Sequence, residues 1–170
     1  MTIPIHSDFI HLHNHTEYSL LDGSCRIKDM IKACLQDKME AMAITDHGNL
    51  FGSIEFYKQT LEAGIRPIIG MEAYVCEDMS VKKPGDRSQS ASHHLTLLVR
   101  NMDGYKNLVK ISSVSHLEGF YYKPRVDKSF LRDHAKGLTG MSGCLKGEIP
   151  DLLVQDRYEE AKIKAMEYAA

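Results

Sequence analysis

The chain has 170 residues, of which 43% are hydrophobic, and its formal net charge at pH 7 is −2. This length suits one domain with a hydrophobic core, and the near-neutral charge excludes a general attraction to nucleic acid, so any DNA contact needs a local basic patch. The four cysteines form no CxxC pair, which favours a reducing, cytoplasmic compartment over a disulfide framework. The sequence shows no signal peptide or long apolar span, and no membrane contact is expected.

The segment 9–23 predicts a metal site. His11, His13 and His15 alternate at a predicted strand end and would leave the same face, and a loop turning at Asp22 could return a carboxylate to them. Imidazoles with carboxylates suit Zn²⁺, Mn²⁺ or Fe²⁺ rather than Ca²⁺ or Mg²⁺. The alternatives are surface histidines on an edge strand or a cloning remnant, but a tag would be an uninterrupted histidine run.

Strands and helices then alternate along the chain. Ser24 is expected to cap a helix whose inward residues are Ile27, Met30, Ile31, Cys34 and Leu35. A second helix, near 51–63, is expected to turn Ile54, Tyr57 and Leu61 inward and to stop at Gly64. The remaining expected elements are strands 41–45, 66–75, 94–100 and 137–142, a polar insertion 77–92, a helix 104–117, a loop 118–128, a short helix 129–135, and helices near 146–154 and 157–170. Such repeated units predict an α/β fold with a mostly parallel sheet or barrel.

Further candidate ligands recur at the strand boundaries. His47 follows a short apolar run, Glu72 lies within an apolar strand, and Cys144 closes a short strand in a glycine-rich turn. Taken singly, Glu72 could be ion-paired and Cys144 could be an inert buried thiol. Their recurrence favours one shared site. His94 precedes its apolar run, so its strand either runs against its neighbours or has a different boundary.

Short motifs built from these residues resemble a known family. The motifs are His13-x-His15-Thr16, Leu21-Asp22-Gly23, Ile44-Thr45-Asp46-His47-Gly48-Asn49, Gly70-Met71-Glu72, His94-Leu95-Thr96-Leu97-Leu98 and Ser142-Gly143-Cys144. In order and spacing they resemble the polymerase and histidinol phosphatase (PHP) domain, in the version carried by bacterial replicative DNA polymerase III alpha subunits. The polymerase version is indicated by the segments 18–23, 101–108 and 119–125, so the resemblance covers essentially the whole chain.

The resemblance implies a distorted (β/α)7-like barrel that is incomplete at its C-terminal end. Family members carry a late Gly-Asp-x-His segment with two more metal ligands, and no such motif follows Cys144 here. Residues 1–170 are therefore expected to be the N-terminal portion of a PHP domain from a longer polymerase, without the final Asp-x-His motif and without the polymerase domains.

The resemblance also implies up to three clustered divalent ions, Zn²⁺ or Mn²⁺, with Fe²⁺ as an alternative. The implied ligands are His13, His15 and Glu72 on the first ion, Glu72, His94 and Cys144 on the second, and Asp22 with His47 on the third. Asp22, His47 and Glu72 are the implied catalytic residues. Lys123 and Arg125 would contact the scissile phosphate or a DNA backbone, and a solvated basic loop is an equally weighted alternative.

The implied activity is metal-assisted phosphodiester hydrolysis, as a 3′→5′ exonuclease that proofreads the primer 3′ end for a DNA-directed DNA polymerase. The implied partners are DNA, the rest of the alpha chain and other replisome subunits. One alternative is a non-catalytic scaffold that supports the polymerase, and another is a free-standing phosphatase of the histidinol phosphatase type. Every family ligand expected before residue 170 is present, which favours an active site in the parent.

Two further expectations concern the rest of the histidines and the effect of truncation. The histidines outside the motifs are expected not to bind metal; they are His11, His93, His116 and His134. Because the first and third ions would each lose a ligand from the late motif, the chain is expected to bind metal with partial occupancy and to show little or no exonuclease activity.

Overall fold

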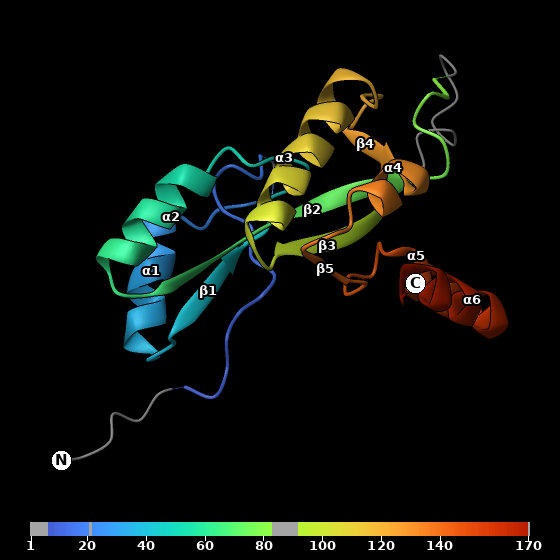
Figure 1. Ribbon diagram of the computed structural model, residues 1–170. Coiled ribbons are helices and arrows are strands. Elements are labelled where there is room, and N and C mark those ends of the chain that lie inside the picture. The colour runs from blue at the N-terminus through green and yellow to red at the C-terminus, as the bar shows by residue number, and fades with distance from the viewer. Residues whose placement is uncertain (1–6, 21, 83–91, 170) are drawn as a thin grey trace.

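The computed structural model describes residues 7–20, 22–82 and 92–169 (Figure 1). The elements, in chain order, are α1 (Ile27–Gln36), β1 (Ala41–Ile44), α2 (Ser53–Glu62), β2 (Arg66–Cys76), β3 (His93–Val99), α3 (Met102–Leu117), β4 (Arg125–Asp127), α4 (Lys128–Asp133), β5 (Leu138–Met141), α5 (Glu148–Val154) and α6 (Tyr158–Ala169). Most of the expected insertion at 77–92 and residue Leu21 lie outside the described residues. The α/β class and the alternation expected from the sequence are confirmed.

The long strand β2 organises a five-stranded sheet in the order β1-β2-β3-β5, with β4 also paired to β2. β1 runs parallel to the first half of β2, and β4 runs parallel to its last three residues. β3 is antiparallel to β2, and β5 is antiparallel to β3. The expectation of a mostly parallel sheet is therefore wrong. The reversed direction of β3 explains why His94 stands before its apolar run rather than after it.

The two faces of the sheet have different roles. Met71, Val75 and Leu97 belong to a hydrophobic cluster that packs against α3 and α4 on one face (Figure 1). Side chains alternate along a strand, so Glu72 and His94 point to the opposite face. A second cluster, formed by α1, α2 and β1, supports the edge of the sheet. Glu72 is thus held on a strand whose other side is anchored in the core.

Helix α2 is where the predicted burial is wrong. Ile54, Tyr57 and Leu61 are 58%, 48% and 51% exposed, whereas Phe56 and Thr60 are fully buried. The Thr60 hydroxyl donates to the carbonyl of Phe56 at 2.7 Å, so its polar group is satisfied within the helix. The buried face of α2 therefore includes Thr60, and the apolar residues that the helical periodicity predicted to be inward face outward instead.

Helix α1 begins at Ile27, and the predicted cap at Ser24 is also wrong. Its N-cap is Arg26, which makes no side-chain capping hydrogen bond. Instead, the amide of Ile27 donates to Glu17 Oε2 at 3.1 Å, so a carboxylate from the preceding segment takes the capping role. Of the five predicted inward residues, Leu35 is half exposed. No helix among the described residues has both the length and the apolar character needed to cross a membrane.

Candidate metal centre

The histidine segment is extended but is not a strand, contrary to the prediction. The amide of Ala43 donates to the carbonyl of His11 at 3.0 Å, and the amide of Thr45 donates to the carbonyl of Asn14 at 2.9 Å. The Asn14 side chain adds a 3.0 Å hydrogen bond to the carbonyl of Ala43. The segment therefore lies along β1. The side chain of Asn14, which stands between His13 and His15, fixes it there.

His47 reaches the site because the chain continues beside β2 after β1 ends. The amide of Glu72 donates to the carbonyl of Asp46 at 3.0 Å, and the amide of Gly48 donates to the carbonyl of Glu72 at 2.9 Å. His47 and Glu72 are thus bridge partners. On its outer side, His47 Nε2 lies 2.8 Å from Asp22 Oδ2, and the Asp22 side chain is 62% exposed.

His94 and Cys144 come from the other side of β2. His94 pairs with Tyr74 in the antiparallel register, which places it diagonally across from Glu72. The amide of His94 donates to the carbonyl of Lys146 at 2.9 Å, so the loop after β5 folds back on β3. That loop brings Cys144 Sγ to 3.5 Å from His94 Nδ1.

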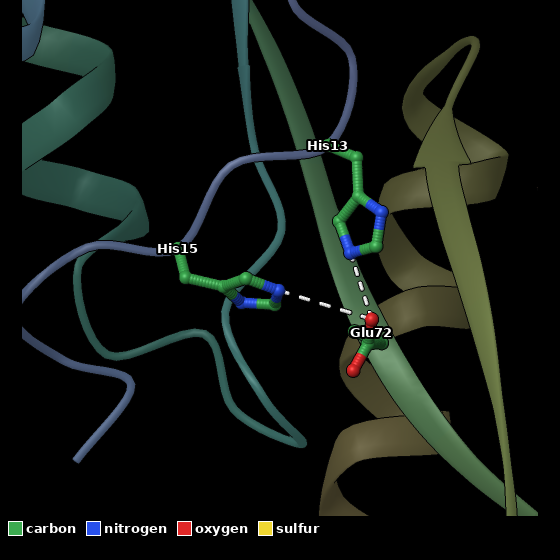
Figure 2. A group of neighbouring side chains, drawn as sticks. All are labelled: His13, His15 and Glu72. Atoms are coloured by element: carbon green, nitrogen blue, oxygen red, sulfur yellow. Dashed lines mark ion pairs between the residues drawn. The ribbon is translucent and has the colours of Figure 1, made fainter. Parts of the chain in front are cut away.

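The Glu72 carboxylate is the centre of the cluster. One oxygen, Oε2, lies 2.7 Å from His13 Nε2 and 3.8 Å from His15 Nε2 (Figure 2). The other, Oε1, lies 2.7 Å from His47 Nδ1 and also contacts His94 Nδ1. Glu72 is 1% exposed, so four imidazoles surround one buried carboxylate.

Several of these buried atoms lack the hydrogen bonds that burial requires. Among the described residues, His13 Nε2, His47 Nδ1 and Glu72 Oε1 have no hydrogen-bond partner despite their short separations. Orphaned buried polar atoms are costly in a folded protein, and cations bound within the cluster would satisfy all three. The ligand atoms of His13, His15 and Glu72 lie within 4.8 Å of one another, as do those of His47, Glu72 and His94. Each group thus brings together three ligand atoms of the kinds that bind one divalent ion in proteins.

The electrostatics of the cluster agree with this fit. Burial alone would raise the pKa of the Glu72 carboxyl, but interactions with His13, His47 and His94 hold it well below its usual range. Contact with Glu72 raises the pKa of His47, and Asp22 adds to that effect. Burial lowers the pKa of His15, with His47 contributing. Glu72 is therefore ionised at neutral pH, and His15 favours the neutral form that a metal requires.

Asp46 is a positioning residue that the sequence did not identify as one. Its Oδ1 accepts from the Thr16 amide and the Ser19 hydroxyl, both at 2.6 Å, and its Oδ2 accepts from the Thr16 hydroxyl at 2.8 Å. The Ser19 hydroxyl in turn accepts from the His47 amide at 3.1 Å. Asp46 thus ties the histidine loop to the strand that presents His47. Its motif showed a carboxylate beside a histidine, but its hydrogen-bond donors lie about 30 positions away.

The two predicted phosphate-binding residues lie in different environments. Lys123 is exposed, and its ammonium lies 4.5 Å from the centre of the Tyr74 ring, which contacts His47 and His94. Arg125 is fully buried, and its guanidinium donates to backbone carbonyls, including those of Met79 at 3.1 Å and Val81 at 3.0 Å. Contact between Arg125 and a phosphate is contradicted by this placement, because the side chain braces a loop instead.

The four histidines expected not to bind metal lie outside both ligand groups. His116 Nε2 donates to the carbonyl of Gly48 at 2.9 Å, and His134 Nδ1 donates to the carbonyl of Phe130 at 2.9 Å. His11 stacks edge-on against Phe9, and His93 pairs with Val75 in the sheet. The structure thus brings together all seven residues of the implied ligand set, and their role as ligands stays a prediction.

Comparison with known proteins assigns the family. The PHP domain model matches residues 11–170, so the chain belongs to the PHP domain family. Its relatives include the DNA polymerase III subunit alpha of Borreliella burgdorferi, which is 51% identical over 92% of this chain and 14% of the relative. The same subunit from Thermus aquaticus is 48% identical over 94% of this chain and 13% of the relative. The chain thus spans about one seventh of the length of these curated relatives.

Two solved structures give more distant likenesses. A protein described as a metal-dependent phosphoesterase, from Bifidobacterium adolescentis, is 18% identical with a TM-score of 0.41, over 62% of this chain and 32% of the other. An amidohydrolase from Chromobacterium violaceum, with bound sulfate and no metal, is also 18% identical, with a TM-score of 0.42 over 92% of this chain and 50% of the other. Likenesses at this level do not bear on activity.

Proposed function

We propose that this chain carries a divalent-metal phosphoesterase site that acts on the 3′ end of DNA within a polymerase III alpha subunit. The observation that carries the proposal is the Glu72 carboxylate, which is buried among four imidazoles. Two imidazole nitrogens that face it, His13 Nε2 and His47 Nδ1, have no hydrogen-bond partner. Such a cluster is costly unless a cation occupies it. The family and the relatives supply the substrate class and the larger chain.

The residues divide by the ions that they would hold. His13 and His15 would share one ion with Glu72, and Glu72 would bridge to a second with His94 and Cys144. Asp22 and His47 would hold a third ion nearer to solvent, joined by ligands from a late Asp-x-His segment that these 170 residues do not contain. The soft Cys144 thiolate favours Zn²⁺ or Fe²⁺ at the second position, whereas an exposed carboxylate suits Mn²⁺ at the third. When bound, such ions polarise a phosphate and lower the pKa of water.

The chain's own groups would orient the substrate and move the proton. The Asp22 carboxylate is largely exposed and bonded to His47, so it lies at the mouth of the cluster, where it can accept a proton from an attacking water. Lys123 extends beyond Tyr74 and can contact a phosphate oxygen. Burial, together with the charges of Glu72 and Asp22, raises the pKa of Tyr74 to about 12, so its hydroxyl stays protonated.

The wider setting is part of the same proposal. The chain would be the first portion of a PHP domain, followed by the rest of a replicative polymerase and working with DNA and other replisome subunits in the bacterial cytoplasm. A non-catalytic scaffold is the competing function. The orphaned ligand atoms around Glu72 support a bound cation, and the exposed Asp22 carboxylate beside His47 favours a catalytic site open to solvent over a purely structural ion.

The decisive test uses the intact polymerase subunit that carries this sequence. Removal of a mismatched primer 3′ nucleotide would be measured with Mn²⁺ or Zn²⁺, comparing the unchanged subunit with Asp22→Asn. We expect mismatch removal to fall by at least about a hundredfold, since the exposed carboxylate loses its charge. Primer extension on a matched end is the control and should be unchanged.

Two results would contradict the proposal. Equal mismatch removal by the Asp22→Asn subunit would assign the cutting to another site and leave this domain as a scaffold. Absence of bound metal from the intact subunit, measured by elemental analysis after gel filtration, would remove the cation on which the proposal depends. The isolated chain is a weaker test, since its expected occupancy is partial and its expected cleavage is slight.

A further inference from the structure

An exposed row of three aromatic rings lies beside the metal centre. The row consists of Phe51, His116 and Phe120, hereafter the aromatic row. Ring centres are 6.3 Å apart between Phe51 and His116, and 6.4 Å apart between His116 and Phe120. Phe51 is 67% exposed and Phe120 is 51% exposed. Large rings are usually buried, so a contiguous exposed row is a candidate interaction surface.

The row is fastened to the same loop that presents His47. The Asn49 side chain donates to the carbonyl of His47 at 3.0 Å and accepts from the amide of Phe51 at 3.1 Å, so the loop between them is braced. His116 joins this loop by donating to the carbonyl of Gly48 at 2.9 Å. The three rings, from two separate parts of the chain, are therefore held in fixed relation to the ligand His47.

Gly48 also connects the aromatic row to a cationic edge. Its φ is +61°, and an added Cβ would come within 2.6 Å of Pro124 Cγ and 3.1 Å of Tyr74 Cε2. Lys123 adjoins Pro124, and its ammonium lies over the Tyr74 ring. The next residue back, Tyr122, is 56% exposed and has a φ of +60°, which costs a non-glycine residue free energy. Rings and a positive charge thus surround one side of the cluster.

We propose that the aromatic row is a stacking surface for nucleobases of single-stranded DNA whose 3′ end enters the metal centre. Proteins that bind single strands combine aromatic side chains, on which successive bases stack, with cations that follow the phosphates. A duplex hides its base faces, so the surface selects a frayed or mismatched end. The inference rests on the proposed function, because it supplies the substrate of the same site.

Binding can be tested apart from cleavage. Fluorescence anisotropy of a short labelled single-stranded oligonucleotide would be measured on the chain in the presence of EDTA, which removes metal and prevents cutting. We expect Phe51→Ala and Phe120→Ala each to weaken binding by roughly tenfold. Leu117→Ala is the matched control, since Leu117 is 82% exposed on α3 beside His116 and lies outside the row, and it should leave affinity unchanged.

Two further arms separate stacking from other forms of contact. Phe51→Tyr should retain affinity and Phe51→Leu should lose it, because a leucine keeps apolar surface but has no ring to stack. An abasic oligonucleotide of the same length should bind the unchanged chain more weakly than the normal one does. This difference in affinity should be smaller in Phe51→Ala, which keeps two of the three rings. Circular dichroism of each variant checks that the fold is retained.

The proposal is overturned by equal affinity of the phenylalanine variants and the unchanged chain, or by equal binding of normal and abasic strands, which would indicate phosphate contact alone. It is also overturned if Phe51→Leu binds normally, as a protein-docking surface would allow. These outcomes are independent of the metal centre. Unchanged mismatch removal in the Asp22→Asn test, or absence of bound metal from the intact subunit, would contradict the proposed function while leaving base stacking measurable in EDTA.

Discussion

Two buried glutamates in this chain have opposite kinds of partners. Glu72 is 1% exposed and faces four imidazoles, whereas Glu148 is 8% exposed and faces ammonium and hydroxyl groups. Lys128 Nζ lies 2.8 Å from Glu148 Oε1, and the Tyr168 hydroxyl donates to Glu148 Oε2 at 3.0 Å. A second ammonium, that of Lys164, lies 3.7 Å from Glu148.

The difference lies in the compensating charge. Around Glu148 the protein itself provides the cations, and Lys128 also reaches Glu77 at 2.8 Å, so the network is complete without any ligand. Around Glu72 the partners are titratable imidazoles, and one of them, His47, also contacts the carboxylate of Asp22. A buried carboxylate with such partners lacks a permanent positive charge. Glu148 is therefore structural, joining α5 to α4 and α6, and Glu72 is suited to hold a cation.

The largest effect that we expect is the loss of metal affinity when the Glu72 carboxylate is replaced by an amide. Glu72→Gln should lower Zn²⁺ or Mn²⁺ affinity by more than about a hundredfold, since an amide neither bridges ions nor carries charge. Unfolding of the metal-free variant at pH 8 should match that of the unchanged chain within about 1 kcal/mol, because the amide can donate to an orphaned imidazole nitrogen. Isothermal titration and urea denaturation measure the two effects. Unaltered metal affinity would show that the cation binds elsewhere.

Metal removal gives the next largest effect. Adding Zn²⁺ or Mn²⁺ at a hundred times its dissociation constant should raise the free energy of unfolding by about 2.7 kcal/mol over the EDTA-treated chain. The gain should vanish in Glu72→Gln and persist in Glu148→Gln, as followed by thermal denaturation at fixed metal concentration. A gain that survives in Glu72→Gln would place the stabilising ion outside the cluster.

The matching substitution at Glu148 should lower the stability of the fold and leave metal affinity unchanged. Glu148→Gln removes the charge that Lys128 and Lys164 share and should lower the free energy of unfolding by about 2 kcal/mol. Metal affinity should be unchanged, because α5 contributes no ligand to the cluster. The measurement is urea denaturation in EDTA, with Glu159→Gln on the exposed start of α6 as control. A loss of metal affinity in Glu148→Gln would show that the two carboxylates are coupled.

The sequence predicts one of these glutamates better than the other. Glu72 stands out because an acidic residue interrupts an apolar strand and lies within a motif, and its imidazole partners recur at strand boundaries. Glu148 gives no such signal, since its partners lie 20 residues before and 20 residues after it on separate helices. Most element boundaries follow from hydrophobic patterning, whereas the strand order and the antiparallel directions of β3 and β5 do not. The unusual position of His94 already raised the question of a reversed strand.

Other features depended on contacts that a sequence does not display. Arg125 was expected to contact a phosphate or to lie in a solvated basic loop, yet its guanidinium donates to backbone carbonyls about 45 residues earlier in the chain. The inward face of α2 was misassigned because the Thr60 hydroxyl donates a hydrogen bond to the Phe56 carbonyl in the same helix, which allows this polar residue to be buried. The histidine segment was taken as a strand end, but its fixed shape comes from Asn14 and Thr45 rather than from a regular ladder.

The smallest effect that we expect is at Cys144. It tests whether Glu72 bridges to a second ion that Cys144 also binds. Cys144 Sγ lies 3.5 Å from the same His94 nitrogen that contacts Glu72, so one ion can take all three groups. Because a hydroxyl is a much weaker and harder ligand than a thiolate, Cys144→Ser should lower Zn²⁺ affinity by about tenfold and leave Mn²⁺ affinity nearly unchanged. Cobalt substitution reports the bond directly, since the thiolate charge-transfer absorption of the unchanged chain should be absent in Cys144→Ser. His93→Ala is the matched control, because His93 adjoins His94 but lies outside both ligand groups. Retention of that absorption in Cys144→Ser would assign the sulfur ligand to another cysteine and separate the loop after β5 from the metal centre.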